Sequence, residues 1–119
     1  MSVVGGKKRV VIWRLLLGIL REVHKLHFDT PLGADLDLLM ILGAVVASEN
    51  EGRPTSASKI SNDLEMPRET VRRKMVQLEK LGLLKSSGNG KYGAGPNIRS
   101  EHLPKIVRMI REAAVALTR

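Results

Sequence analysis

Apolar residues dominate the first thirty positions and leave only a narrow polar stripe. The polar positions that recur there at helical spacing are Arg14, Gly18, Arg21, Glu22 and Lys25. This spacing predicts a helix over residues 8–27. A helix that is apolar around most of its circumference needs cover on more than one side, and in a small protein a second subunit is a natural source of that cover.

Helical periodicity returns four times downstream, separated by turn residues. The predicted helices span residues 34–48, 57–64, 68–81 and 101–118. Ser56 is placed to cap the helix from Ala57, and Gly82 to end the helix from Arg68. Gly88-Asn89-Gly90 lies between two predicted strands, residues 83–87 and 91–98, and Asn-Gly favours a tight hairpin. The expected fold class is therefore α+β, mostly α.

The stretch from Thr55 to Tyr92 has the element order of a winged helix-turn-helix: short helix, tight turn, longer helix and hairpin. We expect one domain over residues 1–119, in which residues 34–98 form this motif. Residues 1–33 and 99–119 would then supply N- and C-terminal dimerisation helices.

The helix from Arg68 presents long polar side chains if its apolar residues Val71, Met75 and Leu78 face the core. Such a face suits the major groove of double-stranded DNA, where Arg pairs with guanine and Glu with cytosine. The alternative is an ordinary solvated face; the preceding turn, the hairpin and the local charge favour DNA. Candidate DNA-binding residues are Ser56, Arg68, Glu69, Thr70, Arg72, Arg73, Gln77, Lys80 and the hairpin residue Lys91.

Two segments resemble bacterial winged-helix transcription factors. They are Ser58-Lys59-Ile60-Ser61-Asn62-Asp63-Leu64 with Met66-Pro67-Arg68-Glu69-Thr70-Val71-Arg72-Arg73, and Leu78-Glu79-Lys80-Leu81-Gly82-Leu83-Leu84. The Arg-Glu-Thr-Val-x-Arg core is similar to the DNA-binding domain of the cyclic-AMP receptor family. That resemblance implies base-reading roles for Arg68, Glu69 and Arg73, but no cyclic-nucleotide domain. The flanking helices resemble those of the MarR family, which implies a homodimer.

The net charge of +8 alternates by segment. Residues 1–28 carry +5, residues 29–52 carry −5, residues 53–99 carry +6 and residues 100–119 carry +2. The most basic segment is thus the one with helix-turn-helix character, which favours a polyanionic partner.

Composition argues against several other classes of protein. The chain has no Cys, which excludes disulfides, thiolate metal sites and a cysteine nucleophile and fits a cytoplasmic protein. It also lacks an apolar run of the roughly 18 residues that a membrane helix needs. No nucleophile–base pair, phosphate loop or metal set is evident, so we expect no catalytic residue, metal or cofactor. His24 and His27 are better explained as surface or interface residues than as metal ligands.

The expected function is sequence-specific DNA binding by a homodimer on an inverted repeat, in transcriptional regulation. The alternative is a winged-helix module for protein–protein contact within a larger assembly. The pattern leaves open the operator, any small-molecule effector, and the choice between repression and activation. The expected dimer interface comprises Ile12, Trp13, Leu16, Ile19, Val23, Ile106, Ile110 and Leu117.

Overall fold

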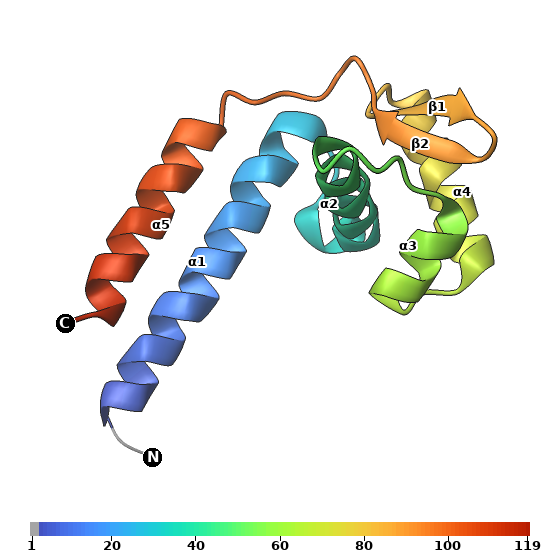
Figure 1. Ribbon diagram of the computed structural model, residues 1–119. Helices are drawn as coiled ribbons and strands as arrows, with labels where there is room; N and C mark the ends of the chain where they lie inside the picture. Colours follow the sequence, from blue (N-terminus) through green and yellow to red (C-terminus); the bar gives the residue numbers. More distant parts are fainter. Residues whose placement is uncertain (1–2) are drawn as a thin grey trace. The chain divides into compact units, whose positions relative to one another are not determined.

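The computed structural model describes residues 3–119, and the chain forms two compact units. One unit, which we call the helical pair, combines Met1–Phe28 with Arg99–Arg119. The other, the central unit, is Asp29–Ile98. Over the described residues, the structure has five α-helices and one two-stranded antiparallel sheet (Figure 1), so the fold is α+β and mostly helical.

The helical pair consists of α1 (Val3–His27) and α5 (Leu103–Leu117), which lie antiparallel (Figure 1). The predicted start of α1 at Lys8 was wrong, because the helix begins five residues earlier and passes through two glycines. Extending an existing helix through Gly costs only about 1 kcal/mol per residue, with no new nucleation. The start of α5 is later than predicted, at Leu103, with Pro104 in the first turn, where its missing N–H does no harm. Within residues 3–119, no helix is long and apolar enough to cross a membrane.

The central unit is built around a core to which each of its helices and β1 contribute. Its elements are a 3₁₀ turn η1 (Leu32–Ala34), α2 (Leu36–Asn50), α3 (Ala57–Leu64), α4 (Arg68–Lys80), β1 (Leu84–Gly88) and β2 (Lys91–Ala94). The apolar side chains buried most completely are Ile41, Val45, Ile60, Val71, Met75, Leu78 and Leu84. The prediction that Val71, Met75 and Leu78 form the inner face of α4 is confirmed. That packing fixes which residues α4 turns outward.

Short polar and glycine signals set the ends of α3 and α4. The predicted bounds of α3 are confirmed, and Ser56 Oγ accepts a hydrogen bond of 3.3 Å from the backbone N of Lys59. Gly82, just beyond α4, has φ +75°, which confirms the predicted left-handed cap. The predicted start of α2 at Ala34 was wrong, because a 3₁₀ turn ends there and Asp35 N donates to Leu32 O.

The hairpin pairs Leu84 with Ala94 and Ser86 with Tyr92, and a β-bulge interrupts the ladder after Ser86. The predicted extension of the second strand to Ile98 was wrong, because β2 ends at Ala94. Beyond it the backbone turns back, and Gly95 N donates to Leu83 O at 2.9 Å. Pro96 follows and has no N–H to offer a longer ladder.

Candidate nucleic-acid interface

A groove of about 580 Å³ lies between α4, the start of α3 and the turn of the hairpin. Arg68 and Arg72 reach it from α4, and Lys91 reaches it from β2. Ser56 and Ser58 line it at the N-terminus of α3. Among the described residues that line the groove, none is acidic. Three cations, two serine hydroxyl groups and a helix N-terminus make this groove a suitable place for a phosphate or another anion.

The outer face of α4 lies beside this groove and carries the remaining predicted residues. Because the inner face is buried, Glu69, Arg73, Gln77 and Lys80 are exposed to solvent, and Thr70 is half-buried at the edge. The predicted set therefore divides into residues that line the groove and residues on the free face of the helix. Val76 lies between them, exposed, and offers an apolar contact of the kind that fits a thymine methyl group.

An ion pair joins the two parts of the site. Arg72 Nη1 lies 3.2 Å from Glu69 Oε1, one helical turn away, and both side chains are largely exposed. An exposed pair at this spacing is worth only a few tenths of a kcal/mol. Either side chain is therefore free to exchange this partner for a ligand at little cost.

The hairpin is held against the rest of the central unit by backbone and carboxylate contacts. Tyr92 N donates to Thr55 O at 2.8 Å, and Thr55 is almost fully buried. Glu49 of α2 accepts a hydrogen bond from Ala94 N, and Glu79 Oε2 accepts one of 3.3 Å from Ser86 N. These contacts fix the register that places Lys91 at the groove.

Among the residues that line the groove but were not predicted, three have polar side chains: Ser58, Asn89 and Tyr92. Each lies next to, or within two residues of, a predicted element end. The Asn-Gly hairpin signal placed Asn89 in the turn. The bridge between Thr55 and Tyr92 is needed to show which end of the hairpin meets α3.

The helical pair has an apolar side to which both helices contribute. Four apolar residues recur at spacings of four, three and four residues on each helix: Ile12, Leu16, Ile19 and Val23 on α1, and Leu103, Val107, Ile110 and Ala114 on α5. α1 meets α5 through Gly18 and Glu22, and α5 meets α1 through Lys105 and Met109. Each stripe is offset by about a third of a turn from the residues that face the other helix. Because the two helices are antiparallel, both stripes lie on the same side of the pair. We call these eight residues the apolar face.

The expected dimer interface overlaps with the apolar face only in part. Trp13 is 61% exposed but lies on another side of α1, away from α5. Ile106 is 8% exposed in the single chain, so a second copy has little of it left to cover. Leu103 and Val107 were missed, although their spacing to Ile110 is the signal that identifies them.

Two positions assigned to the solvent stripe of the first helix face α5 instead. A Cβ at Gly18 would collide with the Met109 side chain. Glu22 is only 13% exposed and forms ion pairs with Lys105 at 2.7 Å and Lys25 at 2.9 Å. Hydrogen bonds from Lys105 and Lys25 lower the pKa of the Glu22 carboxyl group. The polar residues at these positions therefore mark the helix–helix contact.

Histidines gather where α1 ends and α5 begins. His27 Nδ1 lies 2.7 Å from Val23 O, and its Nε2 accepts a hydrogen bond of 3.0 Å from Arg99 N. His102 meets the His27 ring edge-on, and its buried Nδ1 has no hydrogen-bond partner among the described residues. Burial, and then the nearby His27, lower the pKa of His102. Over residues 3–119, no group of three or more His, Asp and Glu residues is placed to hold a metal ion.

Comparisons of the chain with protein-family models, with curated proteins and with solved structures found no match. The chemistry of the site is therefore argued from its own residues. These are a basic groove, an exposed polar helix face beside it, and a separate helical pair with an apolar side.

Proposed function

We propose that this protein binds double-stranded DNA sequence-specifically, as a homodimer and as a regulator of transcription. In this proposal the central unit is a winged helix-turn-helix, with α4 as its recognition helix and the hairpin as its wing. The observation that carries the proposal is the groove in which Arg68, Arg72 and Lys91 converge beside the free polar face of α4.

The two parts of the site suit two different kinds of contact. Glu69 and Arg73 on the free face of α4 match the donors and acceptors on base edges in the major groove. Arg68 stands at the start of the same helix, where recognition helices reach the bases. Lys91 and the N-terminus of α3 at Ser56 are suited to phosphates, which position a protein on DNA without reading sequence.

Selection from a random duplex library, followed by sequencing of the retained fragments, tests this proposal. The parent protein is expected to enrich one motif. Arg68→Ala and Arg73→Ala are each expected to weaken binding to that motif by about 1–3 kcal/mol and to relax base preference. Lys74→Ala is the matched control, because Lys74 belongs to the same helix but does not line the groove and is half-buried away from the free face.

The experiment has two outcomes that contradict the proposal. Failure of the parent to enrich any motif would remove sequence-specific DNA binding altogether. Equal losses in Arg68→Ala, Arg73→Ala and Lys74→Ala would show that charge on α4, and not a reading face, carries the binding.

The apolar face of the helical pair supports the homodimer in this proposal. Its residues repeat at the spacing of the core positions of a coiled coil, on two helices at once. Leu103 is 51% exposed and Ile110 is 46% exposed in the single chain. Two copies joined through this face about a two-fold axis would form a four-helix bundle and cover both stripes. A two-fold dimer is expected to read an inverted repeat with half-sites about 34 Å apart, one turn of DNA.

A further inference from the structure

The excess positive charge of the chain lies entirely in the helical pair. That unit has eleven basic and three acidic residues, a formal charge of +8. The central unit has nine of each, and its formal charge is zero. The unit that carries the proposed reading helix therefore exerts little long-range attraction on a polyanion, and the helical pair exerts nearly all of it.

Four of the six Lys and Arg residues of α1 form one stripe. Lys7, Arg14 and Arg21 follow each other at intervals of seven residues, and Lys25 continues the line. All four are exposed. Seven residues are close to two helical turns, so these side chains share one side of α1 and span about 27 Å along it.

Cations on α5 point to the same side of the pair. Glu22 accepts from both Lys25 and Lys105, which places these two lysines on one side of the helix contact. Arg108 is exposed and lies one turn further along α5 from Lys105. By the same antiparallel geometry that aligns the apolar stripes, this side is opposite to the apolar face. We call Lys7, Arg14, Arg21, Lys25, Lys105 and Arg108 the basic face.

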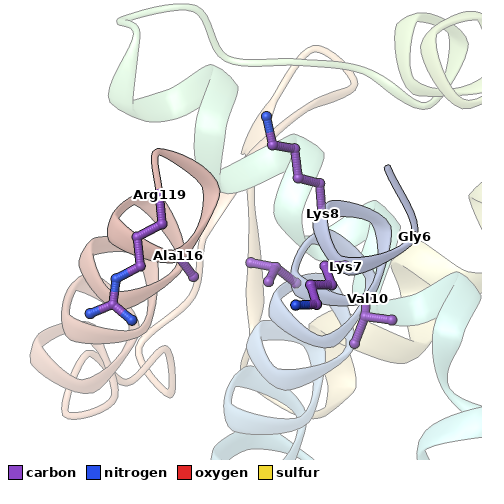
Figure 2. A pocket seen from close by; sticks show the side chains of 7 residues that line it. Gly6, Lys7, Lys8, Val10, Ala116 and Arg119 are labelled. Carbon is purple, nitrogen blue, oxygen red and sulfur yellow. The ribbon is translucent and has the colours of Figure 1, made fainter. Parts of the chain in front are cut away.

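The basic face continues into a groove between the N-terminal end of α1 and the C-terminal end of α5. Lys7, Lys8 and Arg119 surround this groove of about 920 Å³, and Val10, Val11 and Ala116 provide its apolar lining (Figure 2). Its described lining contains no acidic residue. On α5 the exposed Glu112 lies one turn beyond Arg108 on the same side, so the positive charge reaches the open end of the pair through Lys7, Lys8 and Arg119.

The positions of the basic and apolar faces favour a nucleic-acid backbone over a lipid surface as the partner of the basic face. A lipid surface is bound by helices whose apolar residues insert next to their cations. Here the exposed apolar side chains next to the cations are few, chiefly Val10 and Leu17. The apolar face lies on the opposite side of the pair, so a bilayer that met the basic face would leave the apolar face in water. A phosphate backbone needs cations alone, and the planar forks of Arg14, Arg21 and Arg108 match phosphate oxygens.

We propose that the basic face binds the phosphate backbone of double-stranded DNA without reading its sequence. This inference rests on the proposed function and assigns it a second DNA-contacting surface. In a four-helix bundle formed by two helical pairs through their apolar faces, the basic faces lie on the outside of the bundle. The helical pair then supplies the sequence-independent attraction and the counterion release that the uncharged central unit lacks.

The test measures the salt dependence of binding to a random-sequence duplex of about 20 bp, for the full chain. Arg14→Gln/Arg21→Gln is expected to reduce the log–log salt slope by about 1.8, because each phosphate that the protein no longer neutralises lowers the slope by about 0.9. Raising the salt from about 50 to about 200 mM should then cost the variant about tenfold less affinity than it costs the parent. Arg9→Gln/Arg111→Gln is the matched control: it removes the same charge from exposed sites of the same two helices, off the basic face.

The outcomes separate this inference from the proposed function. Equal slopes in the parent and Arg14→Gln/Arg21→Gln, or equal reductions in the two double variants, would overturn the inference while motif selection by α4 still stands. A parent that binds no duplex at all would overturn both. Binding to phosphatidylserine vesicles that Arg14→Gln/Arg21→Gln abolishes, with an unchanged duplex slope, would overturn the inference in favour of a lipid surface.

Discussion

At the scale of single residues, Gly95 is the glycine of the central unit that lies closest to another segment of backbone. A Cβ there would overlap the carbonyl group of Gly82, whose oxygen also accepts a hydrogen bond from Asn97 N. The chain crosses itself at this point as it leaves the hairpin. Only a residue without a side chain lets the two backbone segments come this close.

Gly95→Ala is therefore expected to lower the free energy of unfolding by about 1–3 kcal/mol, because backbone has to move to make room. Gly43→Ala is the control: Gly43 is exposed within α2, with nothing within 4 Å of the added Cβ. There the substitution is expected to raise the free energy of unfolding by about 0.5–1 kcal/mol, through helix propensity. Urea unfolding followed by circular dichroism measures both, and equal effects at the two positions would contradict this account.

His102 offers a second test at this scale. Burial lowers its pKa in the folded state, whereas the unfolded chain has the ordinary value of about 6.5. The unfolded state then binds more protons as the pH falls through 6.5, so His102 disfavours the folded state progressively below that pH. An NMR titration of the imidazole Hε1 signals is expected to show His102 titrating below 6.5. His102→Asn should reduce the fall of the melting temperature between about pH 7 and pH 5; an unchanged fall would show that another group controls it.

At the scale of elements, the hairpin places one of its two lysines at the groove. Lys91 of β2 lines the groove, whereas Lys85 of β1 does not. The paired register and the contact between Tyr92 and Thr55 fix this difference. Lys91 was the DNA-binding candidate expected on the hairpin, and the structure places this lysine, and not Lys85, at the groove.

Lys91→Ala is expected to weaken binding to all duplex sequences about equally and to reduce the salt slope by about 0.9, the contribution of one neutralised phosphate. Lys85 is also an exposed lysine of the hairpin, and Lys85→Ala should leave the slope almost unchanged. Fluorescence anisotropy on specific and random duplexes over a range of salt concentrations measures both. A Lys91→Ala slope equal to that of the parent would indicate a hairpin that does not touch the duplex.

The bounds of the elements show which local signals were sufficient. Ser56 and Gly82 identified the start of α3 and the end of α4 because capping depends on a few neighbouring atoms. The end of β2 did not follow from the sequence, because it depends on hydrogen bonds to Gly82 and Leu83, more than ten residues away. Non-local pairing of this kind leaves little trace in the pattern along the chain.

At the scale of the whole molecule, the apolar face predicts how two copies assemble. Ile110→Glu and Leu16→Glu are each expected to convert the proposed dimer into a monomer, because they place a charge among apolar side chains that a partner would cover. Both residues are exposed in the single chain, so the fold itself should survive. Val115→Glu is the control, since Val115 is 53% exposed on α5 but lies off the apolar face.

Sedimentation equilibrium at micromolar concentration, with circular dichroism to verify folding, measures the effect. Affinity for an inverted repeat should fall in the two monomeric variants and not in Val115→Glu. A monomeric parent, or a loss of assembly in the control as well, would contradict assembly through this face.

The sequence by itself determined the number of α-helices and strands, the inner face of α4 and the presence of a hairpin. These follow from periodicity, caps and turn residues, which act over a few positions. Tertiary structure alone decided which elements share a unit. It placed the acidic α2 and the basic segment that follows in one unit, whose formal charge is therefore zero. The positive charge of that basic segment had been an argument for DNA binding. Tertiary structure also turned Glu22 toward α5 and left Leu103 exposed, because helix–helix contact, and not polarity alone, determines which side of a helix meets water.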